Sequence, residues 1–145
     1  YDLFHPAVLR LIKQTIDAAH QQGIWAGMCG EFASDLFGMF ILLGMGVDEM
    51  SVSPAIIPEA KGIIRSIDSG IAAEVVAQVL KLGTALEVKN LLRREMDRRF
   101  PQLAEFMFNS GGTSCRDPAG FAIPCVDQHG VYIHTIAGKH ICNIA

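Results

Sequence analysis

Two short apolar runs, each followed by a helical pattern, constrain the fold of this chain more than any other feature of its sequence. Residues 24–28 predict a strand because the run is brief and bounded by glycine, and residues 49–53 predict another because they alternate. Apolar residues spaced three and four apart predict helices over 6–22 and 56–67, and N-cap residues before an apolar run predict another over 35–43. Strands that alternate with helices favour parallel pairing through right-handed crossovers. The sequence therefore predicts an α/β fold.

The residues between the first predicted strand and the next helix form a distinct turn. Residues 29–31, Cys-Gly-Glu, would leave the strand, and Ser34 and Asp35 are good N-cap residues for the helix that follows. Residues 44–46, Gly-Met-Gly, would end that helix. We therefore expect the thiol of Cys29 at the carboxyl end of a strand.

The second half of the chain predicts two more helices and then a change of character. The helices are expected over 69–82 and 84–99, and the second opens with the T-x-x-E spacing of a capping box. From residue 108 onward no helical period survives, so we expect one domain over 1–107 and a separate irregular tail over 108–145. The charged residues of the second helix are expected to form a solvated face, with binding of an acidic partner as the alternative. These residues are Lys89, Arg93, Arg94, Glu95, Asp97, Arg98 and Arg99.

The cysteines and histidines give no clear disulfide or metal pattern. The chain has 4 cysteines, too few for a disulfide scaffold at this length, so we expect free thiols in a reducing, cytoplasmic compartment. The tail holds metal-ligand residue types without a Cys-x-x-Cys pair or a finger spacing, which favours scattered loop residues over a zinc site. Those tail residues are Cys115, Cys125, His129, His134, His140 and Cys142.

Composition argues against two classes of partner. A net charge of −3 without a basic run gives no electrostatic footprint for nucleic acid. The apolar stretch 36–47 is about half the ~20 residues that a membrane span needs, so a buried helix is expected there instead. No charged-then-apolar leader opens the chain, and it begins in mid-pattern without a Met. We expect a fragment of a longer protein with no membrane partner.

Several motifs of the first 67 residues resemble one family. They are G-M-C-G-E at 27–31, A-S-D at 33–35, L-L-G-M-G-V-D-E-M-S at 42–51 and, upstream, H-P-A-V-L at 5–9. Together they resemble phosphoenolpyruvate-utilising enzymes, closest to enzyme I of the sugar phosphotransferase system, with a looser likeness to about residue 100. The resemblance implies that the two predicted strands are the last two of a TIM-like (β/α)8 barrel, in which chemistry occurs at the carboxyl ends of strands.

The resemblance also implies a reaction. Enzymes of this family transfer the phosphoryl group of phosphoenolpyruvate to a histidine of a swivelling domain, and then to the histidine-containing phosphocarrier protein of sugar uptake. A cysteine protonates the remaining enolate to pyruvate; the matching residue here is Cys29, and Gly27, Met28 and Gly30 would lie beside the substrate. A thiol suits this role, because its unperturbed pKa of about 8.5 leaves it protonated at neutral pH and available as a general acid.

Other groups that the family needs have no counterpart in this sequence. In the family, the phosphate-binding arginines, the carboxylates that bind Mg²⁺ and the phosphorylated histidine all precede the matching segment. Phosphoryl transfer depends on such groups, so the chain alone is expected to be inactive and to act within a complete, homodimeric enzyme. Two strands taken from a closed barrel would also leave unpaired edges.

Three alternatives remain open at this point. The chain could be the barrel end of a pyruvate phosphate dikinase or phosphoenolpyruvate synthase, which share the cysteine-containing turn. It could instead be a non-catalytic dimerisation or interaction fragment. Cys29 itself could be a small buried hydrophobe, as most free cysteines are.

Overall fold

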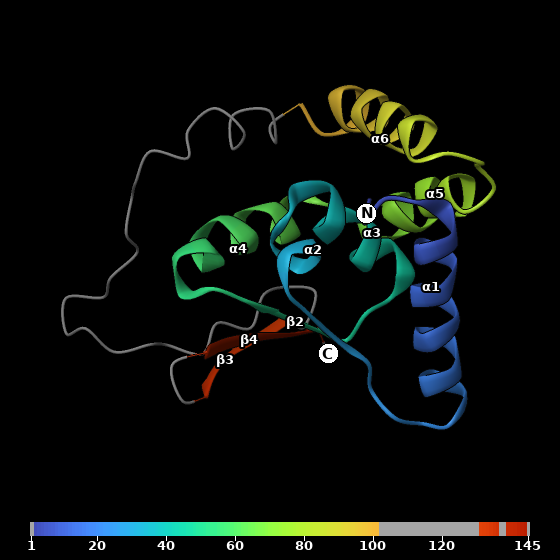
Figure 1. Ribbon diagram of the computed structural model, residues 1–145. Helices are drawn as coiled ribbons and strands as arrows, with labels where there is room; N and C mark the ends of the chain where they lie inside the picture. Colours follow the sequence, from blue (N-terminus) through green and yellow to red (C-terminus); the bar gives the residue numbers. More distant parts are fainter. Residues whose placement is uncertain (1, 102–130, 137–138, 145) are drawn as a thin grey trace.

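In the computed structural model the chain forms a small sheet with helices packed against it (Figure 1). The structure describes residues 2–101 and the backbone of 131–136 and 139–144. The elements in chain order are α1 (Pro6–Gln21), β1 (Gly27–Cys29), α2 (Glu31–Ser34), α3 (Leu36–Met45), β2 (Glu49–Val52), the 3₁₀ turn η1 (Pro54–Ile56), α4 (Ile57–Ser66), α5 (Ser69–Val79), α6 (Ala85–Arg99), β3 (Val131–Ile136) and β4 (Lys139–Ile144). This order confirms the predicted alternation of helices and strands and the two additional helices.

The first helix follows the prediction closely because its ends are fixed by local residues. The His5 ring accepts a hydrogen bond from the Ala7 N–H at 3.2 Å, and Pro6 occupies the first helical position, where its missing N–H costs nothing. After the helix, Gly23 adopts a φ of 69°, a conformation that glycine tolerates best. Both ends of α1 are therefore encoded within a few residues of the sequence.

Strand β1 is shorter than predicted, since 24–26 form a connection instead of strand. The side chains of Ile24 and Trp25 are 59% and 67% exposed. The backbone of Ala26 bonds to the residue before β2: its N–H donates to an Asp48 carboxylate oxygen at 2.7 Å, and its carbonyl accepts from the Asp48 N–H at 3.1 Å. His20 contacts the same carboxylate oxygen at 2.7 Å. The backbone N–H and carbonyl of Ala26 are therefore both hydrogen-bonded without belonging to a strand ladder.

The helix after the turn is capped by one of the two predicted residues. The Asp35 carboxylate accepts a hydrogen bond from the Gly38 N–H at 2.9 Å, which confirms it as the N-cap of α3. Ser34 instead ends α2, and its hydroxyl donates to the Gly30 carbonyl at 3.4 Å. Gly46, with a φ of 78°, ends α3 as predicted.

Helix α3 is the buried helix that its apolar sequence predicts. Residues Gly38 to Leu42 are all buried. Gly44 lets α5 approach closely, because a Cβ added there would lie 2.5 Å from the Ala72 carbonyl oxygen. Within the part of the chain that the structure describes, no helix is both long and apolar enough to cross a membrane.

The sheet has the strand order β1-β2-β4-β3. Strands β1 and β2 are parallel, which confirms the predicted pairing. Strand β4 runs antiparallel to β2 along the edge opposite β1, and β3 pairs antiparallel with β4. One of the two edges expected to be unpaired is therefore covered by the chain's own carboxyl-terminal region.

The prediction of an irregular tail is wrong for 131–136 and 139–144, which are strands. The first of these reads V-Y-I-H-T-I, a run rich in β-branched and aromatic residues that favours strand even though it carries no helical period. The division expected between residues 107 and 108 lies outside the described residues and stays a prediction. The side chains of Cys115, Cys125, His129, His134, His140 and Cys142 lie outside them too.

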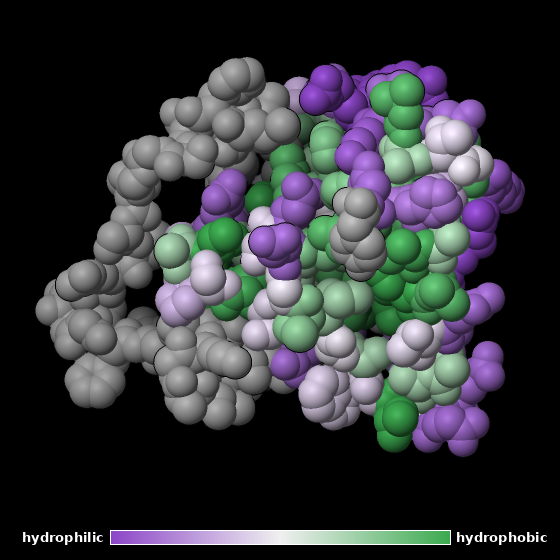
Figure 2. Space-filling model, viewed as in Figure 1, coloured by the Kyte–Doolittle hydropathy of each residue, from purple (hydrophilic) through white to green (hydrophobic). Residues whose placement is uncertain are grey.

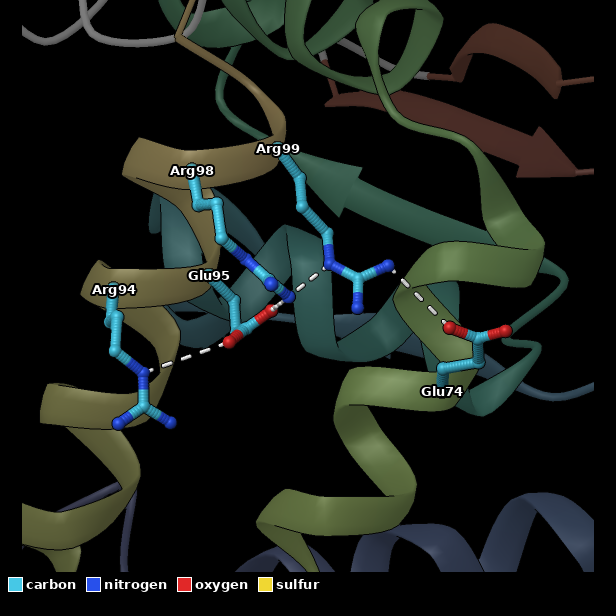
Figure 3. Close-up of polar contacts among 5 residues, drawn as sticks. All are labelled: Glu74, Arg94, Glu95, Arg98 and Arg99. Carbon is cyan, nitrogen blue, oxygen red and sulfur yellow. Dashed lines mark hydrogen bonds and ion pairs between the residues drawn. The ribbon is translucent and has the colours of Figure 1, made fainter.

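The charged face of α6 is mostly solvated, as predicted, but Lys89 and Arg99 are partly buried and Glu95 is buried. Hydrophilic side chains predominate over α6 at the top of Figure 2. The Glu95 side chain is nevertheless buried, and one of its oxygens accepts hydrogen bonds from Arg98 at 2.6 Å and from Arg99 at 3.0 Å. Figure 3 shows these contacts together with Arg94, which lies 3.6 Å from the other oxygen, and Glu74 of α5, which lies 3.5 Å from Arg99. The prediction of full solvation is wrong for Glu95, because i+3 and i+4 arginines compensate the burial of its charge.

Candidate functional site

The predicted turn at Cys29 is present. Cys29 is the last residue of β1, its side chain is exposed, and α2 begins two residues later at Glu31. Gly30 between them has a φ of 96° and a ψ of −166°, a region that is essentially restricted to glycine. This confirms the expected position of the thiol at the carboxyl end of a strand. The alternative that Cys29 is a small buried hydrophobe is wrong.

The parallel strands have one apolar face and one more exposed face. Met50 and Val52 of β2 are buried, and Met28 of β1 packs against the same core. Residues on either side of these in each strand point the other way, because side chains alternate along a strand. Gly27 and Cys29 of β1 are both exposed.

Cys29 shares the exposed face with one hydroxyl of β2. The strand register pairs Cys29 with Ser51 and Gly27 with Glu49. Ser51 and Glu49 are partly buried, between the buried positions of their strand. The thiol and the Ser51 hydroxyl are therefore neighbours across the parallel pair.

An open pocket of about 570 Å³ lies at the carboxyl ends of β1 and β2. Its lining residues come from the turn after β1, from the end of β2 and from η1: Gly30, Glu31, Ser34, Asp35, Ser51, Val52, Ser53 and Ile56. Of the predicted site residues, Gly30 lines this pocket, whereas Gly27, Met28 and Cys29 do not.

Sequence reasoning missed the contribution of β2 to the site. Ser51 and Ser53 line the pocket together with residues of the first turn. The signal was present, because both serines lie at the carboxyl end of the second predicted strand, and adjacent parallel strands place their carboxyl ends at one edge. The strand register was needed to identify Ser51 as the neighbour of Cys29.

The electrostatics of the pocket do not suit an anionic substrate on their own. Glu31 and Asp35 bring carboxylates to the lining, and no lysine or arginine is among the described residues that form it. The Asp35 carboxylate is already engaged with the Gly38 N–H. Within residues 2–101, no group of three or more His, Cys, Asp or Glu side chains is arranged to hold a metal ion. The described residues therefore contain no preformed cluster of protein ligands for the Mg²⁺ that the family resemblance implies.

Comparison with known proteins gives consistent matches. Residues 1–69 match the family described as PEP-utilising enzyme, PEP-binding domain. A phosphoenolpyruvate-protein phosphotransferase of Bacillus sp. (strain S) is 45% identical over 94 residues, which cover 65% of this chain and 16% of the relative. The protein of that name from Haemophilus influenzae is 45% identical over 92 residues, covering 63% and 16%, and the one from Enterococcus faecalis is 46% identical over 87 residues, covering 60% and 15%.

These matches confirm the resemblance that the sequence motifs indicated. The relatives carry the name of an enzyme family, and the chain spans about a sixth of their length. The matched family segment, 1–69, includes β1, β2 and the turn at Cys29.

Proposed function

We propose that the chain, whose residues 1–69 match the family described as PEP-utilising enzyme, PEP-binding domain, is the carboxy-terminal part of the substrate-binding barrel of a phosphoenolpyruvate–protein phosphotransferase. One observation carries the proposal: the exposed thiol of Cys29 ends a strand that is parallel to β2, beside a pocket at the carboxyl ends of both strands. In a (β/α) barrel this is the edge where substrates bind.

The arrangement of faces supports a partial barrel. Met28 and Met50 pack against the helical side of the sheet, as the outward-facing residues of barrel strands do. Cys29 and Ser51 lie on the opposite face, which in a closed barrel would face the interior. Under this proposal β1 and β2 are the last two of eight strands, and the edge of β2 that β4 covers in this chain would pair with the first strand of the closed barrel in the complete enzyme.

In the proposed reaction, Cys29 acts after the phosphoryl group has moved to a histidine of the complete enzyme. The thiol donates its proton to the methylene carbon of enolpyruvate, so a C–H bond forms and the S–H bonding electrons stay on sulfur as a thiolate. General acid catalysis of this kind contributes typically 10²- to 10⁴-fold to a rate. Gly27, Met28 and Gly30 shape the backbone that presents the thiol, and solvent returns the proton afterwards.

The chain is proposed to need the rest of the longer protein. Phosphoenolpyruvate carries a phosphate and a carboxylate, whose charge must be neutralised during transfer, and the described pocket offers two carboxylates and no cation. In the complete enzyme Mg²⁺ would supply part of that neutralisation, held by residues outside those described here. The complete enzyme is proposed to form a homodimer and to phosphorylate the histidine-containing phosphocarrier protein.

Two measurements test this function. In the complete enzyme, Cys29→Ala should lower the steady-state rate of pyruvate formation by about 10²-fold or more; an unchanged rate would remove Cys29 from the mechanism. Calorimetric titration of this chain alone with phosphoenolpyruvate and Mg²⁺ should give no heat of binding. Measurable binding would contradict the proposal that this chain needs the rest of the enzyme to bind substrate.

The identity of the phosphoryl acceptor separates this proposal from its nearest alternative. A dikinase or phosphoenolpyruvate synthase would couple the reaction to a nucleotide. We expect phosphate from labelled phosphoenolpyruvate to appear on the phosphocarrier protein and not on AMP. Label in ATP would favour the alternative.

A further inference from the structure

The residue opposite Cys29 on the neighbouring strand is a serine. The register of the parallel pair sets Cys29 against Ser51. Neighbouring strands lie ~4.8 Å apart, and residues in register project to the same face. A thiol and a hydroxyl on such a pair are within reach of a hydrogen bond through rotation about χ1 alone.

The Ser51 hydroxyl is accessible from the pocket. Ser51 is partly exposed and lines the pocket. Among the residues that the structure describes, no hydrogen bond engages its hydroxyl, whereas the hydroxyl of Ser34 in the same pocket donates to the Gly30 carbonyl. Ser51 can therefore donate to a neighbouring group without losing a hydrogen bond to any described residue.

We propose that Ser51 is a positioning residue that orients the Cys29 thiol and donates a hydrogen bond to the thiolate left after proton transfer. This inference rests on the proposed function of Cys29. The thiol proton goes to the substrate carbon and the electron pair stays on sulfur. The Ser51 O–H then points at that sulfur and stabilises its charge until solvent reprotonates it.

The other polar side chains of the pocket suit this role less well. Ser53 lies beyond the end of β2 and has no register partner in β1. Glu31 carries a negative charge, which would oppose a thiolate instead of stabilising it. Ser51 is the pocket residue that combines a donor with direct pairing to Cys29.

The rate at which iodoacetamide alkylates Cys29 in the full 145-residue chain tests the proposal, because only the thiolate reacts. Mass spectrometry of the Cys29 peptide separates this reaction from those of the other cysteines. Ser51→Ala should slow alkylation at pH 8 about fivefold, the usual effect of losing one hydrogen bond. Ser51→Thr keeps a hydroxyl on a strand-compatible side chain and should react within about twofold of the parent.

Two controls keep the result interpretable. Ser53→Ala removes a hydroxyl from the same pocket without touching the Cys29 pair, and should leave the alkylation rate within about twofold of the parent. Far-ultraviolet circular dichroism reports whether each variant is folded. The role of Ser51 would be overturned if Ser51→Ala were alkylated at Cys29 as fast as the parent or faster. It would also be overturned if Ser51→Thr were alkylated as slowly as Ser51→Ala.

A second readout uses the complete enzyme. Ser51→Ala should lower kcat for pyruvate formation about fivefold and leave KM for phosphoenolpyruvate unchanged, because the hydrogen bond forms to the thiolate and not to the substrate. If Cys29→Ala abolishes activity while Ser51→Ala leaves kcat intact, the inference fails and the proposed function stands. If Cys29→Ala leaves activity intact, the proposed function itself fails.

Discussion

Glu95→Gln perturbs the one charged side chain that α6 buries. In the parent, a single Glu95 oxygen accepts from Arg98 at 2.6 Å and from Arg99 at 3.0 Å. Glutamine has nearly the same shape and keeps an acceptor oxygen, so the change removes charge and little volume. The expected loss of stability therefore measures the charge-assisted part of these two contacts.

The size of the stability loss expected for Glu95→Gln depends on how exposed Arg98 and Arg99 are. A hydrogen bond to a charged group contributes about 1.5–3 kcal/mol when both partners are buried. The Arg98 side chain is 62% exposed and that of Arg99 is 26% exposed, so water competes for both donors. We expect Glu95→Gln to lower the free energy of unfolding at pH 7 by about 1–2 kcal/mol in total.

The effect should depend on pH. The hydrogen bond from Arg98, followed by that from Arg99, lowers the pKa of Glu95 from its ordinary value of 4.5, against the opposing effect of burial. A carboxyl whose pKa is lower in the folded state contributes stability above its unfolded pKa and loses that contribution as the pH falls through the folded value. The difference between parent and Glu95→Gln should therefore shrink as the pH falls below 4.5.

Urea unfolding followed by circular dichroism at pH 7 and under acid conditions measures both quantities. Glu74→Gln is the matched control, because Glu74 is 68% exposed and meets Arg99 only at 3.5 Å. It should cost less than about 0.5 kcal/mol, as exposed ion pairs do. The argument would be refuted if parent and Glu95→Gln had the same free energy of unfolding at pH 7. It would also be refuted if the difference between them were as large under acid conditions as at pH 7.

Two glycine substitutions test the packing and the turn. Gly44→Ala should lower the free energy of unfolding by roughly 1–3 kcal/mol in a urea titration, because the new Cβ would lie 2.5 Å from the carbonyl oxygen of Ala72. Gly30→Ala should cost on the order of 1–3 kcal/mol in the same assay, since its φ of 96° is strained for any residue with a Cβ. Gly83→Ala is the control for both, because the nearest atom to its Cβ would be 3.6 Å away and it should unfold like the parent. Parent-like unfolding of Gly44→Ala or Gly30→Ala would contradict the close approach or the turn, respectively.

The elements that could be predicted from the sequence are those whose limits are set locally. Asp35 caps α3 and Gly46 ends it through contacts within a few residues. Thr84 and Glu87 form the predicted capping box, in which the Thr84 hydroxyl holds the pKa of Glu87 below its ordinary value. The same local logic placed Cys29 where a strand gives way to a helix.

The features that were missed depend on contacts between distant segments. Ala26 leaves the strand pattern because it bonds to Asp48, 22 residues away. Glu95 is buried on a helix that packs with α5, a contact that the charged sequence of α6 does not reveal. Ser51 becomes part of the site only through its register with Cys29.

The central claim is that a thiol at the carboxyl end of β1 protonates an enolate. Rapid-quench analysis of one turnover of the complete enzyme tests it directly, with the phosphohistidine and pyruvate measured in the same samples. The account predicts that Cys29→Ala forms phosphohistidine at the parent rate while pyruvate appears about 10²-fold or more slowly. Pyruvate appearing in step with phosphohistidine in this variant would contradict it.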